Sequence, residues 1–169
     1  MNLRETILEE HSKAQKDKIV SWIGSSQKRF DELFKLFLSD EYRVVQRAAY
    51  PLSYCVRAHP EFINPHWKKL LSNLSKKGIH DAVKRNTLRL MEDIDIPEAF
   101  HGDVMNVCFG YVNTNEESIA VRTFSLTVLD NLSKKYPDIR NELKLIIEER
   151  WPHETAAFRS RARKILKKL

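Results

Sequence analysis

The chain of 169 residues holds 6 histidines, the side chains best suited to metal binding and proton transfer, and they are scattered along it. His59 and His66 are the closest pair, but Pro60 and Pro65 lie between them, so they do not form the i, i+4 pair of a helical metal site. No glycine-rich phosphate-binding loop and no metalloprotease motif occurs. The sequence therefore predicts no metal, no cofactor and no catalytic residue of these kinds.

The 2 cysteines, Cys55 and Cys108, are candidate nucleophiles, and each lies inside an apolar stretch. A reactive side chain needs an activating neighbour, and no serine or cysteine of this chain has a recognisable base beside it in sequence. The spacing of the cysteines also indicates neither a disulfide framework nor a zinc site. We expect both thiols to be reduced and buried.

Arginine is the charged residue that recurs at a regular spacing. The segments "VVQRAAYPLS", "AVKRNTLRLM", "IAVRTFSLTVL" and "AAFRSRARKIL" each have an arginine at their fourth residue, in a similar setting. These residues are Arg47, Arg85, Arg122 and Arg159, at intervals of 38, 37 and 37 residues. A guanidinium group binds carboxylates and phosphates, and it also donates to the free carbonyl groups at helix ends. A constant interval requires each arginine to occupy the same place in a repeated element.

An apolar stripe with the i, i+3, i+4, i+7 spacing of an amphipathic helix precedes each arginine. The stripes are Phe30, Leu33, Phe34, Phe37; Trp67, Leu70, Leu71, Leu74; Val104, Val107, Cys108, Tyr111; and Leu143, Ile146, Ile147, with Arg150 in the last place. Their first residues are 37, 37 and 39 residues apart. Each repeat is therefore predicted to be two helices, an A helix with the stripe and a B helix with the arginine. Phe34, Leu71, Cys108 and Ile147 should be buried at equivalent positions.

The segments "YRVVQRAAYPLSY" and "ESIAVRTFSLTVLDNL" resemble the second helix of HEAT repeats. The resemblance covers roughly residues 26–169 and implies an all-α fold, a right-handed α-solenoid of about four HEAT-like helix pairs with N-terminal capping helices. We expect a single domain over residues 1–169, with the cap at 1–25 and repeats at 26–59, 60–96, 97–136 and 137–169. The cap should end near Gly24, and polar residues at the A–B junctions should cap the B helices.

Composition limits what the protein can be. With 42% hydrophobic and 31% charged residues, the chain is too apolar for general disorder. The N-terminal segment "MNLRETILEEHSKAQ" lacks the apolar centre of a secretory signal, and no apolar run approaches the roughly 20 residues that cross a bilayer. We therefore expect a cytoplasmic protein without a membrane partner.

The net charge of +6 is distributed unevenly. Residues 42–89 hold 10 basic and 2 acidic side chains, residues 90–121 hold 7 acidic and no basic ones, and residues 150–169 hold 7 basic and 1 acidic. The predicted function is a non-enzymatic scaffold that recognises an acidic protein segment through a basic face of the B helices. The predicted binding residues are Arg43, Arg47, Tyr50, Tyr54, Arg57, Lys84, Arg85 and Arg89, with Arg122, Arg159 and Arg163 as secondary candidates.

The repeated arginines have a second interpretation, in which each donates to a helix end or an acidic group of a neighbouring repeat. The basic C-terminal segment "ETAAFRSRARKILKKL" should close the last repeat by docking its apolar side on the last A helix. Nucleic-acid binding stays open and should be weak, because the acidic residues 90–121 interrupt the positive stripe. The sequence indicates no small-molecule substrate.

One enzymatic alternative comes from the resemblance, because some HEAT-like proteins are alkyl-base DNA glycosylases that use aromatic side chains and a carboxylate on a concave basic face. The tryptophans available for that role are Trp22, Trp67 and Trp151, and Glu154 follows Trp151 by three residues. Trp67 also belongs to an A-helix stripe, which favours a place in the core.

Overall fold

The computed structural model describes all residues, 1–169, and contains helices and connecting segments but no β-strand. The α-helices are α1 Leu3–Glu9, α2 Lys13–Ile23, α3 Gln27–Phe37, α4 Tyr42–Ala58, α5 Trp67–Leu74, α6 Asp81–Glu92, α7 His101–Val112, α8 Ile119–Ser133, α9 Ile139–Arg150 and α10 Ala156–Leu166. Three short 3-10 helices accompany them, η1 Pro60–His66, η2 Glu98–Phe100 and η3 Trp151–His153. The predicted all-α fold is confirmed.

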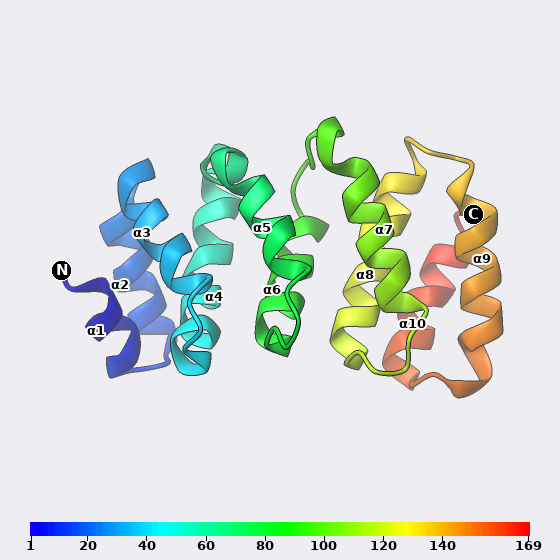
Figure 1. Ribbon diagram of the computed structural model, residues 1–169, viewed down its shortest axis with the longest axis horizontal. Coiled ribbons are helices and arrows are strands. Elements are labelled where there is room, and N and C mark those ends of the chain that lie inside the picture. Colours follow the sequence, from blue (N-terminus) through cyan, green and yellow to red (C-terminus); the bar gives the residue numbers. More distant parts are fainter. The chain divides into compact units, whose positions relative to one another are not determined.

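The chain divides into two compact units, Met1–Ile94 with α1 to α6 and Asp95–Leu169 with α7 to α10 (Figure 1). In the first unit α4 is the central helix and packs against α1, α2, α3 and α6. In the second unit α8 has the same role and packs against α7, α9 and α10. Because α4 and α8 are both B helices, each unit is organised around a helix that carries a repeated arginine.

The apolar stripes of the A helices lie in the cores of these units. In α3 the stripe is completely covered, since none of its four residues is more than 2% exposed. The four residues predicted to be equivalent, Phe34, Leu71, Cys108 and Ile147, are 2%, 8%, 0% and 0% exposed. This common burial confirms the alignment of the four stripes.

The last helix, α10, buries Phe158, Ala162 and Ile165. Its main neighbour is α8 and not α9, so the expectation that it docks on the A helix of its own repeat is wrong. The physical reason is that consecutive B helices pack against each other, as α4 and α6 also do, and the apolar side of α10 therefore faces the preceding B helix.

Polar residues between the predicted helices cap the N-termini of some of the observed helices. The hydroxyl groups of Ser118 and Thr155 accept hydrogen bonds from the third backbone N–H beyond them, each at 3.3 Å, and cap α8 and α10. In α4 the N-cap residue Glu41 makes no side-chain capping bond. The second N-terminal helix, α2, ends at Ile23, and Gly24 follows with a φ of 52°, a value that glycine adopts without steric cost. None of the helices combines the length and hydrophobicity that crossing a bilayer requires.

Truncation of Leu71 to alanine should lower the free energy of unfolding by roughly 2–5 kcal/mol, because it removes a buried side chain from the A-helix stripe. Leu145 on α9 offers a matched control, since it is 65% exposed. Leu145→Ala should change the free energy of unfolding by about 0.5 kcal/mol or less. Urea denaturation of both variants measures the difference, and equal losses would contradict the assignment of the buried stripe.

Candidate functional site

Arg47 donates to the end of a neighbouring helix. Its Nη1 atom lies 2.7 Å from the carbonyl oxygen of Leu8 and 3.4 Å from that of Ile7, in the last turn of α1. The last carbonyl groups of a helix have no partner within the helix, so the guanidinium supplies donors that α1 lacks. Arg47 thereby connects the central helix of the first unit to its N-terminal helices.

Arg159 makes the same kind of contact in the second unit. Its Nε atom donates to the carbonyl of Trp151 at 2.9 Å, and its Nη2 atom donates to that of Pro152 at 3.2 Å. Both carbonyl groups belong to η3, which directly follows α9. The arginine of α10 therefore holds the junction at the end of α9.

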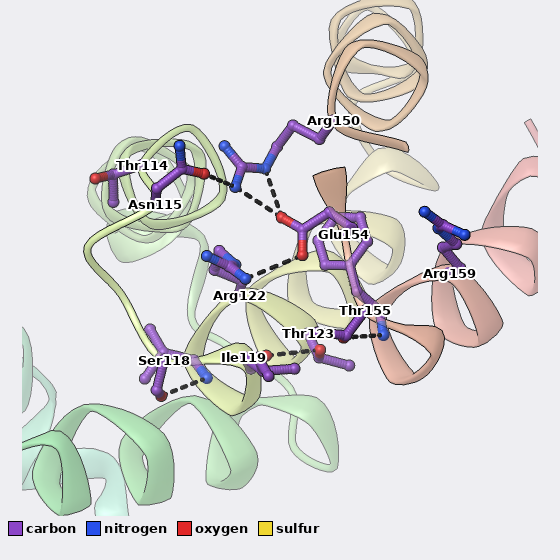
Figure 2. Close-up of polar contacts among 12 residues, drawn as sticks. Thr114, Asn115, Ser118, Ile119, Arg122, Thr123, Arg150, Glu154, Thr155 and Arg159 are labelled. Carbon is purple, nitrogen blue, oxygen red and sulfur yellow. Dashed lines mark hydrogen bonds and ion pairs between the residues drawn. The ribbon is translucent and has the colours of Figure 1, made fainter. Parts of the chain in front are cut away.

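Arg122 binds a carboxylate at that same junction (Figure 2). Its Nη2 atom lies 3.0 Å from Oε2 of Glu154, while the Nε and Nη2 atoms of Arg150 lie 2.8 and 2.7 Å from Oε1. Nη2 of Arg150 also donates to Oδ1 of Asn115 at 2.8 Å. The cluster of Arg122, Arg150, Glu154 and Asn115, here called the junction cluster, joins α8, the end of α9 and the segment that precedes α8.

Burial makes the junction cluster important for stability. The side chains of Glu154 and Arg122 are 1% and 9% exposed, so the carboxylate has almost no access to water. An ionised carboxylate in such a place is costly unless it is paired and hydrogen-bonded, and here two guanidinium groups supply three hydrogen bonds. Removal of one partner would leave a buried charge only partly compensated.

Arg85 differs from the other repeated arginines. Its Nη1 atom is 3.7 Å from Oδ2 of Asp81, one turn earlier in the same helix. The side chains are 39% and 46% exposed, and such surface pairs contribute little to stability. Arg47, Arg122 and Arg159 therefore connect different elements, whereas Arg85 contacts its own helix.

The predicted binding residues of the first unit fall into two groups. Arg43 and Arg89 are exposed, and neither donates to a group of the protein. Arg57 is also exposed, but its Nε and Nη2 atoms lie 2.9 and 2.5 Å from Oδ2 of Asp93. Lys84 is half-buried on α6. On α4 and α6, Arg43 and Arg89 are thus without a partner in the protein, whereas Arg47 and Arg57 each have one.

Tyr50 and Tyr54 pack against α2. Their ring centres are 5.4 Å apart at an interplanar angle of 88°, and the ammonium group of Lys16 lies 3.8 Å from the centre of the Tyr54 ring. Lys16 is 5% exposed, and its hydrogen bond to Asp17 raises its pKa above the usual value. This part of α4 is therefore partly covered by a cationic contact from α2, although Tyr54 stays 37% exposed.

The side chains that the sequence offered for catalysis are buried or already bonded to other groups of the protein. Burial raises the pKa of both thiols, Cys55 and Cys108, to about 12, so neither is a thiolate near neutral pH. Trp67 is 1% exposed, and Glu154 is engaged by two arginines. Those two side chains do not form the exposed aromatic and carboxylate pair that the glycosylase alternative needs. No group of three or more histidine, cysteine or acidic side chains is placed to hold a metal ion.

Sequence reasoning missed the part that Arg150 and Asn115 play in the junction cluster. One signal was present, because Arg150 takes the last place of the fourth stripe, where the other repeats have apolar residues. An arginine at a position that faces the interior needs a buried acceptor. Glu154, four residues later, is that acceptor, whereas the contact with Asn115 spans 35 residues and has no local sequence signal.

Substitution of Arg122 by methionine should lower the free energy of unfolding by about 2–4 kcal/mol, since Glu154 then keeps only Arg150 in a buried site. Arg43→Met is the matched control, because Arg43 is an exposed arginine of a B helix without a protein partner. That variant should change the free energy of unfolding by about 0.5 kcal/mol or less. Chemical denaturation of both variants makes the comparison, and a similar stability of the two would mean that the buried contact is not important.

Comparison with known proteins agrees with this architecture. A family model described as a HEAT repeat domain matches residues 3–169, which is nearly the whole chain. The comparisons with curated proteins and with solved structures found no match. With helix pairs repeating at about 37 residues, buried stripe residues in every A helix and a family match over its length, the chain belongs to the HEAT repeat domain family.

Proposed function

We propose that this chain is a non-enzymatic protein-interaction module that binds an acidic protein segment through the basic B-helix face of the first unit. HEAT repeats commonly mediate protein interactions, which supports a binding role for the chain as a whole. The charge distribution supports the choice of surface, because residues 42–89 carry a net charge of +8. A surface with this excess attracts acidic partners and speeds their association.

The observation that carries the proposal is the difference between paired and unpaired arginines on α4 and α6. Arg47, Arg57 and Arg85 each have an acceptor within the protein. Arg43 and Arg89 are exposed and have none, so a partner can bind them without displacing an internal contact. We therefore take Arg43 and Arg89 as the principal binding residues.

The contacts between α4 and α6 indicate how far apart these two arginines are. The rings of Tyr42 and His80 lie 4.9 Å apart near the start of the two helices, and Arg57 pairs with Asp93 near their ends. A residue of α4 therefore lies beside the residue about 37 positions later on α6, and Arg89 is level with the third turn of α4. At about 1.5 Å per residue this places the two arginines ~13 Å apart along the helices. Along the helix axes, this component of the separation corresponds to about four residues of extended chain.

Tyr42 adds an apolar contact to the same surface. Its side chain is 50% exposed at the first turn of α4, next to Arg43. Tyrosine and arginine are enriched among the residues that dominate binding energies in protein interfaces. Tyr42 was not among the residues predicted from the sequence, and we include it in the proposed face.

Reversal of both charges, Arg43→Glu with Arg89→Glu, should weaken binding of a fluorescent peptide rich in aspartate and glutamate at least tenfold in an anisotropy titration. Melting temperatures should change little, because both side chains are exposed and unpaired. The control is Lys68→Glu with Lys69→Glu, an identical charge change on exposed lysines of the A helix α5. The control should retain affinity within about threefold. Equal losses would indicate attraction by net charge and contradict a binding face on the B helices.

Nucleic acid is the second candidate partner, and the basic side of α10 supports it. Arg163 lies over the ring of Trp151 at 5.7 Å, and Lys164 and Lys167 are exposed without an acidic partner. An aromatic ring with nearby cations is a surface on which phosphates and bases bind. The acidic residues 90–121 argue against a long positive track, so this binding should be weak and independent of sequence.

Affinity for duplex DNA should therefore fall by at least tenfold between 50 and 200 mM salt, as expected for contacts made mainly to phosphates. Fluorescence anisotropy with two duplexes of unrelated sequence measures both the salt dependence and the selectivity. Tight and sequence-selective binding at physiological salt, or release of an alkylated base from the duplex, would make nucleic acid the primary substrate class and displace the acidic protein segment.

A further inference from the structure

A polar pocket adjoins the junction cluster of the second unit. It has a volume of about 270 Å³ and is lined by Asn113, Asn115, Glu149, Arg150 and His153. The lining comes from the segment before α8 and from the end of α9 with η3. The pocket therefore brings a guanidinium, an imidazole and two carboxamides to one place, all of them groups that can donate hydrogen bonds to an anion.

Arg150 is the most firmly held of these donors. Its side chain is 12% exposed, and its Nε and Nη2 atoms are fixed by Glu154 and Asn115. The hydrogen bonds of Arg150 use Nε and Nη2, and none of them uses Nη1; Figure 2 draws these bonds to Glu154 and Asn115. A rigid arginine with a free donor end at a pocket is pre-organised to bind an oxyanion.

The charges of the junction cluster indicate which oxyanion. Arg122 and Arg150 carry two positive charges and Glu154 carries one negative charge, so the nearly buried cluster has a net charge of +1, which the exposed carboxylate of Glu149 offsets only from the solvent side. A ligand group with a single negative charge would neutralise it. Glu149 on the pocket lining is exposed and opposes more highly charged anions such as phosphate.

We propose that this pocket binds a small monocarboxylate, with the carboxylate on Nη1 of Arg150 and the side-chain amides of Asn113 and Asn115. The volume exceeds that of a carboxylate group, so the pocket also has room for a short chain on the ligand. This site lies in the second unit and does not depend on the partner proposed for residues 42–89.

The test is a titration of the isotope-labelled full chain with butyrate at constant ionic strength, followed by NMR at the side-chain amides of Asn113 and Asn115 and at Nε–H of Arg150. We expect saturable shifts at these three groups. Butyramide has the same shape without the charge and should cause none. Two further titrations use chloride at the same concentration, which should cause no such shifts, and inorganic phosphate, which should bind less tightly than butyrate.

Two variants of exposed lining residues keep the test independent of folding. Glu149→Gln removes the opposing charge and should tighten butyrate binding roughly 2- to 5-fold, the range for a surface charge pair. Asn113→Ala removes one donor and should weaken it roughly 3- to 10-fold. The proposal is wrong if butyramide or chloride produces the same shifts, if phosphate binds more tightly than butyrate, or if Glu149→Gln leaves the affinity unchanged.

Discussion

The structure depends on which donors bind the unpaired carbonyl groups and the buried carboxylate at the ends of its helices. A helix ends with carbonyl groups that have no partner, and a helical repeat multiplies such ends. Arg47 and Arg159 donate directly to these carbonyl groups, and Arg122 binds the carboxylate of Glu154 at the junction after α9. Three of the four repeated arginines thus connect different elements, each through a different acceptor, whereas Arg85 contacts only its own helix. Packing of the apolar stripes supplies the bulk of the stabilisation, and the arginines fix the ends of helices against their neighbours.

These contacts also distinguish the cations that have partners within the protein from those that are free to bind a ligand. The N–H groups of an arginine that already bind an internal acceptor can bind a partner only by giving up that acceptor, and this costs a large part of the binding energy. Arg43 and Arg89 face no such cost, since they are exposed and unpaired. The same argument applies to Arg150 in the second unit, where one end of the guanidinium is fixed and the other is free. Both proposed binding sites therefore rest on donors that make no contact within the protein.

The sequence predicted the helix pairs, the buried stripe and the place of the repeated arginine, because all three follow from local periodicity. Phe34 and Ile147 lie 113 residues apart, and their common burial could be inferred from their place in the stripe alone. The acceptor of each arginine could not be inferred in this way. Arg122 reaches Glu154 across 32 residues and Arg47 reaches Leu8 across 39, and the direction along the chain is opposite in the two cases. That choice depends on which helix packs beside α4 or α8, and the same packing explains why α10 lies on α8 and not on α9.

The most direct test of this account is a double-mutant cycle on Arg122 and Glu154. The free energy of unfolding is measured by urea denaturation for the wild type, Arg122→Met, Glu154→Gln and the double variant. If the buried contact fixes the junction, the two substitutions should be strongly non-additive, with a coupling energy of about 1.5–3 kcal/mol. A coupling energy of about 0.3 kcal/mol or less would show that the two side chains act independently. The contact would then contribute little to holding the junction, and the regular spacing of the arginines would need another explanation.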